Sequence, residues 1–203
     1  MGRGTIMGMT RQVRAVGVLL AAGAGRRMGR PKALVRAADG TPWVRRGVDV
    51  LRGGGCEEVV VVLGASADAV RPLLADADVR IVEAADWSVG MGASLRTGLR
   101  ALDDGTTGAD ACLVSLVDLP DVGPDVVARL LTTAAPDALA RATYAGRPGH
   151  PVLVGRSHWP AMAASLSGDE GARRYLADHG AAAVECGDLA TGQDVDRLDD
   201  VGT

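Results

Sequence analysis

Apolar runs alternate with amphipathic segments along most of the chain, and this alternation predicts strands followed by helices. The clearest apolar run, Glu58–Leu63, contains four consecutive valines, and Val13–Leu20 and Ala111–Val117 are similar. Uninterrupted apolar runs of this length are typical of strands that are buried on both faces of a parallel sheet. A shorter strand is expected at Val79–Glu83.

Segments with helical periodicity separate these strands. The expected helices are Pro42–Arg52 (with Thr41 as N-cap and Pro42 in the first position), Ser66 to about Ala75, Met91–Leu102 and Gly123–Ala134. Further along we expect a strand pair, Leu139–Tyr144 and Val152–Val154, around a turn at 146–149, then short helices near Ser157–Ser165 and Gly168–His179, a last strand at Ala182–Cys186 and a terminal helix at Val195–Val201. The order predicts an α/β fold: a three-layer α/β/α arrangement with a mostly parallel, Rossmann-like sheet.

The chain shows no internal boundary after its first residues. Residues 1–12 lack periodicity and contain three glycines, so we expect a disordered N-terminal tail. Residues 13–203 are expected to form a single domain, with ligands bound beyond the carboxyl ends of the parallel strands.

Composition excludes several classes of partner. Lys plus Arg total 22 and Asp plus Glu total 25, and aromatic residues make up 2%, so neither a basic surface nor a base-stacking platform for nucleic acid is expected. No apolar run approaches the roughly 18 residues of a membrane span. The three cysteines lie far apart, which argues against disulfides or a zinc site and favours a reducing, cytoplasmic location with each thiol buried.

The loop after the first strand, residues 20–32, combines glycines with positive charge. Glycines let the backbone present several N–H groups to one anion, and four cationic side chains add to this: Arg26, Arg27, Arg30 and Lys32. The loop does not fit a Walker A sequence, and Met28 stands where a dinucleotide fingerprint needs its third glycine. A polyphosphate is the best match, and a basic surface turn is the alternative.

Asp118 follows a buried strand directly, so its carboxylate is expected at the ligand-binding edge of the sheet. Nucleoside triphosphates arrive with Mg²⁺, which takes one or two protein carboxylates besides phosphates and water. Asp118 is therefore the first candidate ligand for Mg²⁺. Its alternative role, capping the next helix, suits Asp121 and Gly123 better.

The loop sequence L-A-A-G-x-G-x-R-M-G-x-x-K resembles the signature of the MobA-like NTP transferase superfamily. That resemblance implies a nucleotidyltransferase sheet and transfer of a nucleoside monophosphate from an NTP. It implies that Arg27, Lys32 and Asp118 act in catalysis. It also implies that the loop wraps the triphosphate, through Leu20, Ala21, Ala22, Gly23, Ala24, Gly25, Arg27 and Lys32.

Four later segments resemble the molybdenum cofactor cytidylyltransferase (MocA-like) branch: G-M-G-x-S-L-x-x-G at 90–98, D-x-P at 118–120, G-H-P-V at 149–152 and G-D-x-G-A-R at 168–173. They imply transfer of CMP from CTP to the phosphate of molybdopterin, for a molybdoenzyme of the xanthine oxidase class. Gly92 and Ser94 would then contact the nucleotide, and His150, Asp169 and Arg173 the second substrate. A local hydrogen bond for His150, an N-cap role for Asp169 and a surface ion pair for Arg173 stay open.

The sequence identifies the second metal ligand and the nucleotide base less clearly. Residues 193–200 resemble the family's D-I-D-T-P-E-D segment, but Arg197 and Leu198 depart from it. Asp196 is the better candidate ligand and Asp194 the next, while a solvated acidic terminus is the alternative. Ala22 favours CTP, since guanosine users of the family carry L-A-G-G. The rival functions are another cytidylyl- or guanylyltransferase and a non-catalytic cofactor chaperone.

Overall fold

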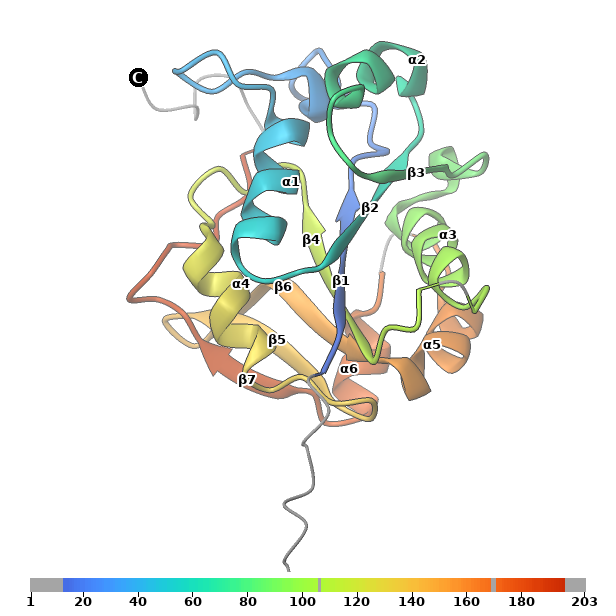
Figure 1. Cartoon of the computed structure of the whole chain (residues 1–203), viewed down its shortest axis with the longest axis vertical. Helices are drawn as coiled ribbons and strands as arrows, with labels where there is room; N and C mark the ends of the chain where they lie inside the picture. The colour runs from blue at the N-terminus through green and yellow to red at the C-terminus, as the bar shows by residue number, and fades with distance from the viewer. Residues whose placement is uncertain (1–12, 106, 169–170, 196–203) are drawn as a thin grey trace, which may run out of the picture.

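The computed structural model describes residues 13–105, 107–168 and 171–195, and these build one seven-stranded sheet (Figure 1). Its order is β3-β2-β1-β4-β6-β5-β7. The strand β6 runs antiparallel to β4 and β5, and the other neighbouring pairs are parallel. The strands are β1 (Ala15–Leu20), β2 (Glu58–Leu63), β3 (Arg80–Glu83), β4 (Ala111–Leu116), β5 (Leu139–Tyr144), β6 (Arg147–Gly155) and β7 (Ala182–Glu185).

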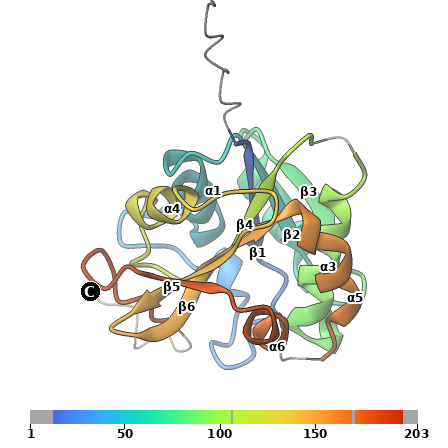
Figure 2. The same cartoon turned by 90° about the horizontal axis from the view of Figure 1, so that it is seen from below.

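Helices cover both faces of the sheet, which confirms the predicted three-layer, mostly parallel α/β fold (Figures 1 and 2). One face carries α1 (Trp43–Gly53), α2 (Ala67–Val70) and α4 (Pro124–Leu131). The other carries α3 (Met91–Leu102), α5 (Trp159–Ser165) and α6 (Arg173–Asp178). Among the described residues, no helix has the length and apolar character needed to cross a bilayer.

Strand alternation divides the apolar side chains between two cores. In β1, Leu19 faces α1 while Val18 and Leu20 face α3, and each of the three is at most 7% exposed. Successive side chains of a strand point to opposite faces, so an uninterrupted apolar run fills both layers. This is the physical reason why the apolar runs in the sequence are enough to predict β1, β2 and β4.

Several predicted boundaries were wrong. Pro42, not Thr41, is the N-cap of α1, because its backbone is extended and its carbonyl accepts the first helical hydrogen bond, from the Arg46 N–H. The helix expected after Ser66 is split into the four-residue α2 and a 3₁₀ turn, Arg71–Leu74, which contains Pro72. The strand β6 begins at Arg147 and not at Val152, since the turn uses only Ala145 and Gly146, both at positive φ.

Other C-terminal expectations are shortened or fall outside the description. Among the described residues of the helix expected at Gly168–His179, the helical ones are Arg173–Asp178. The tail 1–12 and almost all of the terminal helix expected at Val195–Val201 lie outside the described residues. The three cysteines are buried and free, as expected, and burial raises the pKa of Cys56 to about 12.

Glu185, at the end of β7, holds the turn between β5 and β6. Its carboxylate accepts hydrogen bonds from the Ala145, Gly146 and Gly187 N–H groups and from the Thr143 hydroxyl, at 2.8–3.1 Å. These bonds favour the ionised form and lower the pKa of Glu185.

The pKa of Glu185 is lower in the folded protein than in the unfolded chain, so its charge stabilises the fold at pH values above the unfolded pKa. This stabilisation is lost as the pH falls through the folded pKa. Glu185→Gln should therefore lower the thermal unfolding midpoint near pH 7, and the gap to wild type should narrow at acid pH, as the pH falls through the lowered pKa of Glu185. Thermal unfolding at both pH values checks this. The matched control is Glu58→Gln, on the first residue of β2. A gap that is equal at both pH values would contradict the role given to the Glu185 charge.

Candidate functional site

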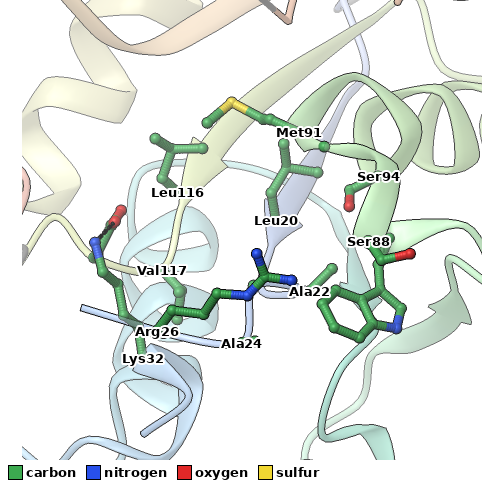
Figure 3. Close-up of a pocket in the computed structure, with 15 residues that line it drawn as sticks. Leu20, Ala22, Ala24, Arg26, Lys32, Ser88, Met91, Ser94, Leu116 and Val117 are labelled. Carbon is green, nitrogen blue, oxygen red and sulfur yellow. Dashed lines mark hydrogen bonds and ion pairs between the residues drawn. The ribbon is translucent and has the colours of Figure 1, made fainter. Parts of the chain in front are cut away.

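A cavity of about 400 Å³ opens at the carboxyl ends of β1 and β4, where the fold predicts ligand binding (Figure 3). Three segments form its walls: the glycine loop after β1, the segment between β3 and α3, and the end of β4. Its lining consists of Leu20, Ala22, Gly23, Ala24, Gly25, Arg26, Lys32, Trp87, Ser88, Gly90, Met91, Ser94, Leu116, Val117 and Asp118.

The glycine loop turns back sharply at Gly25, which has a φ of +61°. A side chain there would place its Cβ 1.8 Å from the Arg30 carbonyl oxygen, so only glycine fits. The Met28 N–H donates to the Gly25 carbonyl, and the buried Met28 side chain anchors the loop. The position where a dinucleotide fingerprint would need its third glycine therefore holds a side chain that packs in the core.

Lys32 and Asp118 form an ion pair on one wall of the cavity, with 2.6 Å between Nζ and Oδ2, and Figure 3 marks this contact of Lys32 with a dashed line. The Lys32 side chain is 16% exposed and the Asp118 side chain 15%. The other carboxylate oxygen, Asp118 Oδ1, is buried and accepts no hydrogen bond from the described residues. A buried oxygen without a donor is an open position for a cation.

The opposite wall is formed by Trp87 and by the first turn of α3. Gly90, at φ +137°, precedes this helix, and Ser94 lies within it with 5% exposure. The N-terminus of a twelve-residue helix adds partial positive charge beside the cavity. Trp87 supplies an apolar surface on the same side.

A second cavity, of about 140 Å³, adjoins the first, and the two share Leu20 and Met91 in their linings. His150 on β6 and Arg173 on α6 line it together with Arg141 on β5. Burial lowers the pKa of His150 to about 4, and the nearby Arg141 charge acts in the same direction, while Asp194 opposes it.

The structure places most of the predicted site residues in these two cavities. Leu20, Ala22, Gly23, Ala24, Gly25, Lys32, Ser94 and Asp118 line the first, and His150 and Arg173 line the second. Ala21 packs in the core beside α1, and Arg27 is exposed and absent from the lining. Gly92 lies against the Gly168 carbonyl, to which its N–H donates.

The two remaining candidates, Asp169 and Asp196, lie outside the described residues. The described segment before Asp196 does reach the site, because the Val195 N–H donates to the Asp118 carbonyl at 3.0 Å. Asp121 fixes the same segment through the Thr191 N–H and hydroxyl. Among the described residues, no three His, Cys, Asp or Glu side chains cluster as a metal site.

The sequence pointed to Arg26 only as one of four loop cations and gave the site role to Arg27, whereas Arg26 lines the first cavity and Arg27 does not. Arg141 was missed altogether. Arg141 belongs to no motif, but the strand sequence L-A-R-A-T-Y carries one signal. An arginine at an inward position of a buried strand calls for an explanation.

Comparison with known proteins adds the family. The profile described as "MobA-like NTP transferase domain" matches residues 17–184, which span the sheet and both cavities. The chain belongs to the MobA-like NTP transferase family. The signature loop and the Lys32–Asp118 pair therefore lie within the family's shared domain.

Three known proteins are similar to this chain over nearly its whole length. Nicotine blue oxidoreductase from Paenarthrobacter nicotinovorans is 39% identical, covering 95% of this chain and 97% of its own. A nucleotidyl transferase from Methanothermobacter (Mth528) superposes with a TM-score of 0.78 at 24% identity, over 92% of this chain and 94% of its own, and supports the fold alone. Rv0371c from Mycobacterium tuberculosis H37Rv, in complex with manganese, has a TM-score of 0.70 at 27% identity, over 90% and 94% of the two chains.

Lys32→Met should lower the free energy of unfolding by about 3 kcal/mol, because it leaves the Asp118 carboxylate buried without its cation. Adding Asp118→Asn should restore most of this loss, since the uncompensated charge disappears. Chemical denaturation of the single and double variants measures both effects. As a control, Arg71→Met breaks an exposed pair with Glu83 and should cost less than about 1 kcal/mol. If the double variant is as unstable as Lys32→Met alone, the loss does not come from an uncompensated Asp118 charge.

Proposed function

We propose that this chain transfers CMP from CTP to the phosphate of molybdopterin and releases pyrophosphate. The observation that carries the proposal is the first cavity, in which a cationic glycine loop faces a carboxylate with an open buried oxygen. Such a site suits a triphosphate together with a divalent cation. The membership of the family supports the transfer chemistry, and the MocA-like segments support the choice of acceptor.

The donor set fits Mg²⁺, and Asp118 would hold it through Oδ1, with Asp194 or Asp196 as the candidate second ligand. When bound, the ion supplies neutralisation of phosphate charge and orientation of the reacting oxygens. The complex of Rv0371c with manganese supports a divalent ion as the cofactor. Lys32, held 2.6 Å from Asp118, would exchange this partner for a phosphate oxygen when CTP binds.

The protein's own residues contribute positioning and charge. Two anions must approach each other for in-line attack on the α-phosphorus, so cations that hold the leaving pyrophosphate lower the barrier. Arg27 and Lys32, with the loop N–H groups, are proposed for this task, and Arg26 joins them from the cavity wall. The attacking phosphate is already ionised near neutral pH, so no strong general base is needed.

The products and setting follow from the same proposal. The cytosine dinucleotide form of the cofactor would pass to a molybdoenzyme of the xanthine oxidase class in the cytoplasm. His150, Asp169 and Arg173 are proposed for the acceptor, and Gly92 and Ser94 for the nucleotide.

Asp118→Asn should reduce CMP transfer at least about a hundredfold, because it removes the charge that would hold the cation. Pyrophosphate release with Mg²⁺, CTP and molybdopterin measures this. Asp125→Asn, in the exposed first turn of α4, is the matched control and should keep full activity. If Asp118→Asn still delivers cofactor to a target enzyme at the wild-type rate, the protein acts as a chaperone instead.

Ala22 is proposed to select the base, because its side chain lines the first cavity and a methyl group there would obstruct a purine. Wild type should prefer CTP to GTP, ATP and UTP, and Ala22→Gly should raise the use of GTP relative to CTP by about tenfold. Pyrophosphate release with each of the four nucleotides checks both statements. A clear GTP preference in wild type would make the protein a guanylyltransferase.

The 39% identity to nicotine blue oxidoreductase, over nearly the whole of both chains, supports a second candidate function, a redox reaction. Against it, the loop lacks the third glycine of a dinucleotide fingerprint. Oxidation of NADH or NADPH by nicotine blue in the presence of this protein, without pyrophosphate release from any nucleotide, would favour the redox function.

A further inference from the structure

The second cavity holds positive charge in apolar surroundings. Its walls are formed largely by Leu95, Val114, Val152, Val154, Met162 and Leu176, together with Leu20 and Met91. Three nitrogen-bearing side chains interrupt this surface: Arg141, His150 and Arg173. The feature that needs explanation is Arg141, because no sequence motif contains it.

Strand register fixes the direction of Arg141. It pairs with Val152 of β6, so both side chains lie on the sheet face that carries α3, α5 and α6. Its neighbours in sequence, Ala140 and Ala142, are buried in the opposite core. A two-residue period therefore forces the arginine inward, towards the cavity.

The Arg141 guanidinium is poorly satisfied by the protein. Nη2 donates to the Gly149 carbonyl at 3.3 Å, while Nε is buried and has no hydrogen-bond partner among the described residues. Burial and the charge of Arg173 both lower the pKa of Arg141, so the nearby protein groups destabilise its charged form. Arginine stays protonated in proteins, and a partly buried guanidinium with a buried, unpartnered nitrogen is stabilised by an anion.

We infer that Arg141, with Arg173 and His150, forms an anion-binding subsite in the second cavity that takes a phosphate monoester group of the acceptor. The identity of the acceptor rests on the proposed function, whereas the subsite itself rests on the geometry. Two arginines suit a dianionic phosphate better than a single carboxylate, since each fork donates to two oxygens. The buried His150 imidazole stays neutral near pH 7 and adds one further donor or acceptor.

The chain offers a site-specific probe, because it contains only three histidines. His158 packs edge-on against Tyr175 and His179 stacks on it, both outside the cavity lining, so their imidazole resonances serve as internal references. Inorganic phosphate, titrated into histidine-labelled protein near pH 7, should shift the His150 resonance saturably and leave the other two unchanged. His150→Gln assigns the peak.

Arg141→Gln should raise the half-saturating phosphate concentration about tenfold or more, because it removes charge-assisted hydrogen bonds. Arg147→Gln, on the exposed start of the same hairpin strand, is the matched control and should leave the titration unchanged. Arg27→Gln, in the other cavity's loop, should also preserve it. If Arg141→Gln fails to fold, Arg141→Lys keeps the charge, loses the planar fork and should still weaken binding several-fold.

Absence of a His150 shift, or an unchanged midpoint in the folded Arg141 variant, would overturn the inference. Acetate binding as tightly as phosphate would overturn the assignment to a phosphate group. The titration contains no nucleotide, so its success or failure is independent of CMP transfer. A protein that transfers CMP but shows no phosphate response at His150 would refute the subsite alone.

Discussion

The Lys32–Asp118 ion pair is the interaction around which the site is organised. It joins the end of the glycine loop to the end of β4, two segments separated by 86 positions in sequence. Without a charge partner, a carboxylate this deeply placed would be costly to bury. The pair therefore offsets the cost of burying the carboxylate, and it keeps the cation and the carboxylate that the proposed reaction needs at one edge of the sheet.

The sheet determines where this pair can form. The strands β1 and β4 are parallel neighbours, so their carboxyl ends carry the glycine loop and Asp118 to the same place. The described C-terminal segment also reaches this edge of the sheet, where the Val195 N–H donates to the Asp118 carbonyl. The antiparallel strand β6 then brings His150 beside Arg141 of β5, which forms the second cavity next to the first.

Much of the fold was predictable because β1, β2 and β4 are buried on both faces and read as plain apolar runs. The glycine loop and Asp118 were predictable for a related reason, since a strand end fixes their position. Which of the loop arginines lines the cavity, and the role of Arg141, were not. The direction of Arg26 depends on one glycine turn, and that of Arg141 on its pairing with β6. Neither property has a local signature in sequence.

The most direct test of the central claim is a crystal structure with Mg²⁺ and a non-hydrolysable CTP analogue. The account predicts the triphosphate along residues 23–32, the cation on Asp118 and Lys32 turned towards phosphate. A nucleotide bound elsewhere, or a metal that leaves Asp118 paired only with Lys32, would contradict it.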